Sequence, residues 1–120
     1  MNDIRLGVIE AKFAEIVWQN APLSTKELVA ICQEQLNWKR TTTYTVLKKL
    51  CQRGIFRMED STVSVLIGKE EFYAIQSQQF VEDTFRGSLP AFLAAFGSRK
   101  KPSKEELAQI RQILDSFEEG

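Results

Sequence analysis

The sequence lacks histidine, and its 120 residues include two cysteines, Cys32 and Cys51. Triads with a histidine base and zinc sites of the Cys/His type are therefore excluded by the inventory alone. No apolar run approaches the roughly 18 residues of a membrane-spanning helix, and the N-terminal residues MNDIRLGVIEAKF contain no signal-peptide core. We expect a cytoplasmic protein with no cofactor and no stable association with a membrane, whose two thiols are buried.

The sequence also lacks net charge, because 16 basic residues balance 16 acidic ones. Binding to nucleic acid would therefore have to come from local clustering of charge. Such a cluster lies between Trp38 and Met58, where there is no acidic residue and the basic residues are Lys39, Arg40, Lys48, Lys49, Arg53 and Arg57. A basic strip on a helix can also be a merely solvated face, and charge alone leaves this alternative open.

Three amphipathic helices are expected in the first half of the chain. The first lies within residues 4–20, where apolar side chains recur at helical spacing at Leu6, Ile9, Phe13, Ile16 and Val17. The second begins with a capping box, Ser24 with Glu27, and continues to about residue 36. The third spans RTTTYTVLKKLCQR and ends at Gly54, with its inward side chains at Thr43, Val46, Leu47 and Leu50.

The apolar pattern then changes to that of strands. Residues 55–58 and 63–67 are β-branched or aromatic, and turn-forming residues 59–62 separate them, which predicts a β-hairpin. Three helices followed by a hairpin outline a winged helix-turn-helix unit. We expect a mainly α fold with this small hairpin, in which residues 1–68 form a DNA-binding domain and residues 69–120 a helical dimerisation domain.

Helical periodicity returns from Lys69. The pattern predicts a long helix that ends near Arg86, a short helix over residues 88–96, and an exposed basic loop over residues 98–102. A second capping box at Ser103 opens a last helix, whose apolar residues have the 3-4-3 spacing of paired helices. The residues expected to form the dimerisation surface are Phe80, Phe92, Leu107, Ile110, Leu114 and Phe117.

Threonines are concentrated at the start of the third helix, although β-branched residues are mediocre helix formers. Thr42, Thr45 and Lys49 share one face of this helix. Short hydroxyls there can approach base edges and thymine methyl groups, while lysine and arginine bind phosphates. The residues expected to contact DNA are Lys39, Arg40, Thr41, Thr42, Tyr44, Thr45, Lys48 and Lys49.

Four of the residues around this helix have alternative interpretations. Thr41 or Thr42 could merely cap the helix. Tyr44 could donate a hydrogen bond to a phosphate or could simply pack against its neighbours. Trp38, just before the helix, could stack on a ligand, but a tryptophan in this place is more often a core anchor, which is the preferred interpretation.

The stretch WKRTTTYTVLKKLCQRG, which begins at Trp38, closely resembles the recognition-helix signature of the penicillinase-repressor family (BlaI, MecI and CopY-type repressors). The helix with Phe13 and Trp18, the approach to Leu28 and the segment Phe80–Leu89 are similar to the family as well. The resemblance implies a homodimeric winged-helix repressor of double-stranded, dyad-symmetric operators rich in TACA/TGTA half-sites. It matches two threonines that read bases to Thr42 and Thr45, and a core pair to Leu47 and Leu50.

The sequence departs from the family pattern at two places near the DNA-binding elements. Lys39 stands where the family usually has a small capping residue, often serine. The wing tip, residues 59–62, is acidic where the family has Lys/Arg and Gly, so it would repel phosphate.

The resemblance also bears on how the protein would be released from DNA. The cysteine-rich C-terminal motif of the copper-responsive members is missing. The β-lactam-responsive members are cut before a phenylalanine in the short helix of the dimer domain, and Ala95-Phe96 occupies the matching place. This implies a membrane sensor-protease as a partner, while the alternative is that Phe96 is a core residue of the dimer.

Two classes of function remain. The preferred hypothesis is a repressor that binds DNA as a homodimer. A winged-helix adaptor that binds a protein partner is the alternative, which the acidic wing favours and the acid-free run 38–58 opposes. An enzyme is not expected, because nothing supplies a base beside a nucleophile.

Overall fold

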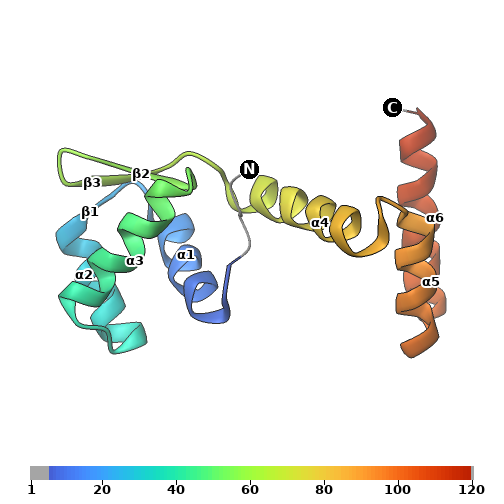
Figure 1. Cartoon of the computed structure of the whole chain (residues 1–120), viewed down its shortest axis with the longest axis horizontal. Coiled ribbons are helices and arrows are strands. Elements are labelled where there is room, and N and C mark those ends of the chain that lie inside the picture. Colours follow the sequence, from blue (N-terminus) through green and yellow to red (C-terminus); the bar gives the residue numbers. More distant parts are fainter. Residues whose placement is uncertain (1–5, 120) are drawn as a thin grey trace. The chain divides into compact units, whose positions relative to one another are not determined.

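The computed structural model describes residues 6–119, and these form six helices and a three-stranded antiparallel sheet (Figure 1). The elements, in chain order, are α1 (Val8–Asn20), β1 (Leu23–Ser24), α2 (Thr25–Leu36), α3 (Arg40–Gln52), β2 (Phe56–Glu59), β3 (Thr62–Val65), α4 (Lys69–Phe85), α5 (Leu89–Arg99) and α6 (Lys104–Glu119). The predicted fold class, a winged helix-turn-helix followed by a helical region, is confirmed. None of the helices within residues 6–119 is both long and apolar enough to cross a membrane.

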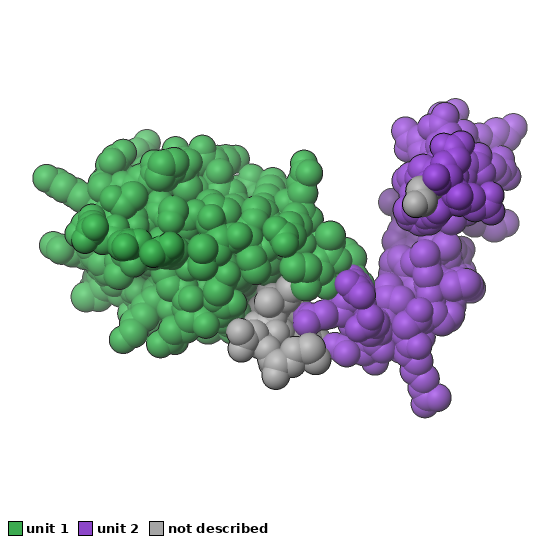
Figure 2. Space-filling view, turned by 90° about the horizontal axis from the view of Figure 1, so that it is seen from above, with its two compact units in different colours: residues 1–77 green, residues 78–120 purple. Residues whose placement is uncertain are grey.

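The chain forms two compact units, one ending at Ser77 and the other beginning at Gln78 (Figure 2). The boundary lies inside α4, so this helix contributes residues to both units. Its first turn belongs to the winged-helix unit, because Phe72 is fully buried in the core of that unit.

The sheet contains one strand that the sequence pattern did not predict. Its strand order is β1-β3-β2, and β1 adds Leu23 opposite Val63 on the edge of the predicted hairpin. Two residues are too few to show the alternating period of a strand, which is why β1 escaped the sequence analysis. Both Leu23 and Val63 are buried, so β1 closes the core on this side.

The residues that were predicted to start and end helices have the expected local structure. The Glu27 N–H donates to Ser24 Oγ over 3.0 Å, and the Ser24 N–H donates to Glu27 Oε1 over 3.3 Å. Ser103 and Glu106 form the same reciprocal pair before α6, with both distances at 3.1 Å. Gly54, just after α3, has a φ of +81°, a conformation that favours glycine. These signals are local, so the sequence alone located them.

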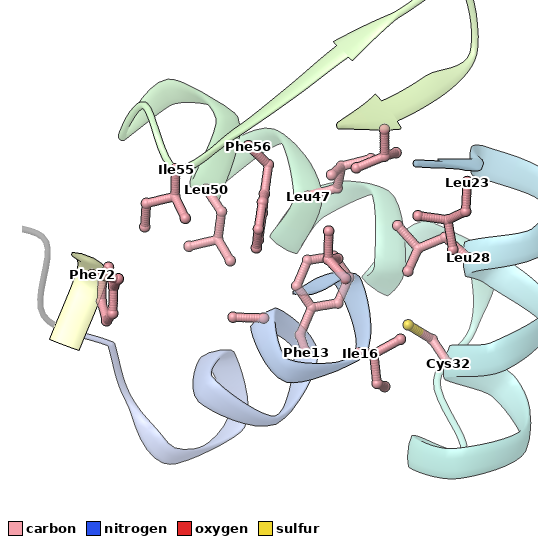
Figure 3. Packing of buried hydrophobic residues seen from close by; sticks show 13 residues of the cluster. Phe13, Ile16, Leu23, Leu28, Cys32, Leu47, Leu50, Ile55, Phe56 and Phe72 are labelled. Carbon is pink, nitrogen blue, oxygen red and sulfur yellow. The ribbon is translucent and has the colours of Figure 1, made fainter. Parts of the chain in front are cut away.

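Figure 3 shows the buried hydrophobic residues of the winged-helix unit, among them Phe13 and Phe56, and two partly buried tryptophans pack against this core. Phe13 stacks on Trp38 with ring centroids 5.7 Å apart and contacts Phe56 edge-on at 6.5 Å. Trp18 lies edge-on to Phe56 at 5.8 Å and donates its indole N–H to the Ile67 carbonyl over 3.0 Å. The interpretation of Trp38 as a core anchor is therefore confirmed.

Two expectations about helix ends and faces are wrong. Ile9 was expected on the buried stripe of α1 but is 55% exposed, because it lies in the first turn, beyond the buried part of the helix. The short helix α5 does not end at residue 96 but continues to Arg99, and the Lys100 N–H still donates to the Phe96 carbonyl. The predicted basic loop is correspondingly shorter, because Ser98 and Arg99 belong to the helix.

We expect Phe13→Ala to lower the free energy of unfolding by about 3–5 kcal/mol, because the ring is fully buried and contacts two other rings. Urea denaturation of the full chain measures this change. Val8→Ala is the matched control on α1; its side chain is 75% exposed, and its effect should stay within about 0.5 kcal/mol. Equal losses in the two variants would contradict the role given to Phe13.

Candidate nucleic-acid interface

The predicted DNA-binding residues lie on the exposed side of α3 or at its start. Successive residues of an α-helix are about 100° apart around its axis, so these residues form three rows along α3. The middle row contains Thr41, Thr45 and Lys48, the row toward α1 contains Thr42 and Lys49, and the row toward the start of α2 contains Arg40 and Tyr44. Tyr44 is half-buried, and the other side chains of these rows are exposed.

The first turn of α3 has no side-chain cap. Lys39 is the N-cap residue and forms no side-chain cap hydrogen bond, so Thr41 and Thr42 lie inside the helix. The interpretation of either threonine as the cap is therefore wrong. Threonine hydroxyls instead satisfy carbonyls within the helix: Thr43 Oγ1 donates to the Lys39 carbonyl over 3.4 Å.

The two threonines expected to read bases differ in how their hydroxyls are used. Thr45 Oγ1 donates to the Thr41 carbonyl over 2.9 Å, so its proton is committed within the helix. Thr42 Oγ1 has no hydrogen-bond partner within residues 6–119, so it can both donate and accept. Thr42 therefore suits a hydrogen bond to a base edge, whereas Thr45 suits contact through its methyl group.

A pocket of about 300 Å³ lies beside the first turns of α2 and α3. It is lined by Thr25, Lys26, Val29, Arg40, Tyr44 and Ser61. The Arg40 guanidinium lies 5.6 Å from the centroid of the Tyr44 ring, a cation–π distance. A hydrogen bond from the Thr25 side chain, and then the Arg40 guanidinium, lower the pKa of the Tyr44 phenol. Two cations and three hydroxyl groups at one opening are the chemistry that a phosphate group prefers.

Lys26 is a residue of this pocket that the sequence analysis did not select. The capping box at Ser24 already placed Lys26 in the first turn of α2. What the sequence could not show is that the turn of the hairpin brings Ser61 to the same opening, where the Ser61 carbonyl accepts from the Thr25 N–H over 2.9 Å. Tyr44 both packs against Arg40 and lines the pocket, so its two interpretations are compatible.

Some of the basic side chains between Trp38 and Met58 already form ion pairs with carboxylates, so they are less available to bind phosphate. Lys49 Nζ lies 2.9 Å from Glu10 Oε2, and Arg53 Nη1 lies 3.7 Å from Glu10 Oε1. The neighbouring Lys49 ammonium is the main cause that lowers the pKa of the Glu10 carboxyl. Arg57 pairs with Glu59 of the wing. Within residues 6–119, the basic residues of the strip that form no ion pair are Lys39, Arg40 and Lys48.

The predicted dimerisation residues lie in the second unit, where no described side chain between residues 78 and 119 is fully buried. The rings of Phe80, Phe85 and Phe92 contact one another with centroids 5.7–6.0 Å apart. Large apolar side chains nevertheless stay at least 36% exposed at Phe80, Leu89, Leu93, Phe96, Leu107, Ile113, Leu114 and Phe117. Ile110, also predicted for the surface, is half-buried on α6.

The remaining candidate groups are the proposed cleavage site and the cysteines. Ala95 and Phe96 lie within α5, and Phe96 is 52% exposed. Cys32 is buried as expected, whereas Cys51 is only half-buried; both are free thiols. Burial raises the pKa of each thiol. Within residues 6–119 there is no cluster of histidine, cysteine, aspartate or glutamate that could hold a metal ion.

A family model and several known proteins match this chain over almost its whole length. A family model described as penicillinase repressor matches residues 6–116. Methicillin resistance regulatory protein MecI from Staphylococcus aureus (strain Mu50 / ATCC 700699) is 23% identical over 110 residues, which cover 88% of this chain and 89% of that protein. The penicillinase repressor of Bacillus licheniformis is 22% identical over 110 residues, with coverages of 88% and 86%.

We expect the Tyr44 phenol to ionise below its ordinary pKa of 10.0, because the Thr25 side chain and Arg40 stabilise the phenolate. Tyr73→Phe removes the other of the two tyrosines, so that absorbance titration reports Tyr44 alone. In that background Thr25→Val and Arg40→Gln should both raise the pKa. Lys48→Gln removes a charge from another row of α3 and should leave the pKa unchanged; an equal shift there would mean that the pocket has no specific effect.

Proposed function

The chain belongs to the penicillinase repressor family, and on that premise we propose that it represses transcription by binding a dyad-symmetric operator as a homodimer in the cytoplasm. The family consists of regulators and not of enzymes. The observation that carries the proposal is the exposed face of α3, where threonines lie between cations that form no ion pair in the described part of the chain, residues 6–119. Such a face combines base readout with phosphate binding.

We assign base readout to Thr42 and Thr45, with Thr41 beside them in the exposed first turns of α3. Phosphate contacts come from Lys39, Arg40 and Lys48, which form no ion pair within residues 6–119, together with the pocket at Tyr44 and Lys26. The acidic wing tip contributes no phosphate contact, since Arg57 in the wing already pairs with Glu59. This acidic tip is the observation that favours the second candidate function, an adaptor that binds a protein partner.

We assign dimerisation to residues 78–119. An isolated unit of this size would leave large apolar side chains in water on α4, α5 and α6. The stripe on α6 has the spacing of paired helices, and a second copy of the chain presents the same stripe. Two copies would also supply two α3 helices for the two half-sites of a dyad-symmetric operator. The predicted roles of residues 1–68 and 69–120 thus become part of this proposal, with the start of α4 packed in the DNA-binding unit.

Substitution of the two threonines should separate hydrogen bonding from methyl contact. Thr42→Val removes a hydroxyl and keeps the shape, so operator discrimination should fall by about 1–3 kcal/mol. Thr45→Val keeps the methyl group and should retain discrimination, whereas Thr45→Ser removes the methyl group and should lose it. Titrations against a duplex with TACA/TGTA half-sites and against a scrambled duplex of the same composition measure these changes.

Two results of these titrations would count against the assignment. Equal weakening on both duplexes would show that the threonines do not read bases. If the wild-type chain binds neither duplex, the adaptor function is favoured.

Leu114→Glu should convert the dimer to a monomer, because it places a charge in the apolar stripe of α6, where burial of each large side chain contributes about 1.5–3 kcal/mol. Sedimentation velocity measures the change in mass. Gln112→Glu adds the same charge to an exposed position on the same helix outside the stripe and should leave the dimer intact. A dimer that persists in both variants would contradict the assignment.

We propose that release follows cleavage of the Ala95-Phe96 bond by a membrane sensor-protease. The bond lies inside α5, so this helix must open locally before it can enter a protease. Cleavage would separate α6 from the aromatic cluster of Phe80, Phe85 and Phe92. Co-expression with a β-lactam sensor-protease, followed by intact-mass analysis, should give two fragments that meet at residue 95, and an inactive protease should give none. An intact chain despite relieved repression would exclude this route.

A further inference from the structure

Glu10 on α1 lies against the C-terminal half of α3. Its side chain is 17% exposed, and its two oxygens lie 2.9 Å from Lys49 Nζ and 3.7 Å from Arg53 Nη1. Glu10 Oε1 also accepts the Gly7 N–H over 3.1 Å, at the first turn of α1. One carboxylate therefore serves as a helix cap and as the partner of two cations from the basic strip.

This arrangement divides α3 electrostatically between its faces, because Glu10 pairs with cations on the side toward α1. Lys39 at the N-cap and the cations of the other two rows, Arg40 and Lys48, face solvent without a carboxylate partner within residues 6–119. Lys49 is adjacent to Lys48 in sequence and is half exposed, with 53% of its side chain accessible, yet its ammonium is already neutralised. A phosphate that approaches Lys49 must compete with a carboxylate at hydrogen-bond distance.

We propose that Glu10 lowers the sequence-independent affinity for DNA by withholding Lys49 from the DNA backbone. The inference rests on the proposed function and concerns the same interface. Phosphate contacts add affinity without regard to sequence, whereas base contacts by threonines depend on sequence. Withholding one cation in each protomer lowers binding to every duplex but leaves base readout unchanged. The affinity for every duplex therefore falls, while the ratio of operator binding to non-specific binding, which the base contacts set, stays the same.

The competing explanation is that Glu10 merely caps α1. Glu10→Gln tests the two explanations, since a glutamine oxygen can still accept the Gly7 N–H while the negative charge is lost. On our proposal the dimer gains about two phosphate contacts, one from each protomer. Affinity for a scrambled duplex should then rise several-fold at low salt. The slope of log affinity against log salt should steepen by about 2.

Glu15→Gln is the matched control. Glu15 lies on the same helix and pairs with Lys69 of α4 at 2.8 Å, away from α3. The substitution changes the net charge of the chain by the same amount, so it measures the general effect of charge. It should leave the salt slope at the wild-type value.

A second pair of variants, Lys48→Gln and Lys49→Gln, tests the lysines themselves in the wild-type chain, and Lys49→Gln is then repeated in the Glu10→Gln background. In the wild-type background Lys48→Gln should make the salt slope of the dimer shallower by about 2, whereas Lys49→Gln should leave it unchanged. In the Glu10→Gln background Lys49→Gln should make the slope shallower by about 2, because the released ammonium is then a phosphate contact. The difference between the two backgrounds is the coupling of Glu10 to Lys49.

The outcomes separate this inference from the function on which it rests. If the wild-type dimer prefers the operator but Glu10→Gln behaves as Glu15→Gln does, the inference is overturned and the proposed function stands. If Lys49→Gln weakens binding in the wild type as much as Lys48→Gln does, Lys49 is an ordinary phosphate contact and the inference is again overturned. Failure of the wild type to bind any duplex overturns both.

Discussion

The stacking of Phe13 on Trp38 is the contact on which the geometry of the winged-helix unit depends. Trp38 immediately precedes Lys39, the N-cap of α3, so the packed indole fixes where this helix begins. Phe13 also contacts Phe56 of β2, and thereby the same ring ties α1 to the hairpin. An apolar contact inside the protein therefore positions the polar residues outside it, since the rows of α3 are held at defined angles to α1 and to the wing.

The turn before Trp38 is equally specific. Asn37 adopts a left-handed conformation, with φ of +57°, and its N–H donates to the Gln33 carbonyl. The Trp38 N–H donates to the Cys32 carbonyl over 3.3 Å, which closes the C-terminus of α2. Backbone hydrogen bonds end one helix, and the aromatic stack starts the next; together they leave one path for the chain between α2 and α3.

The sequence predicts what is local and misses what is distant. The capping boxes at Ser24 and Ser103 and the helix end at Gly54 depend on residues a few positions apart, and all three were predictable. The strand β1 has two residues and no period, so it was not. The acid-free run 38–58 was correctly identified as basic, but its availability depends on Glu10, which is far away in sequence and opposite Lys49 in space. Charge counted along the chain cannot show which charges meet.

Between residues 78 and 119 no side chain is fully buried, and this makes the stability of the unit depend on how much of the protein is present. Such a unit gains little free energy from folding alone, and in the proposed dimer most of its stability would come from association. Stability of this kind obeys mass action, and each tenfold dilution of the chain costs about 1.4 kcal/mol per dimer. The number of copies in a cell would then set the fraction of competent repressor, and growth without new synthesis would erode repression by dilution.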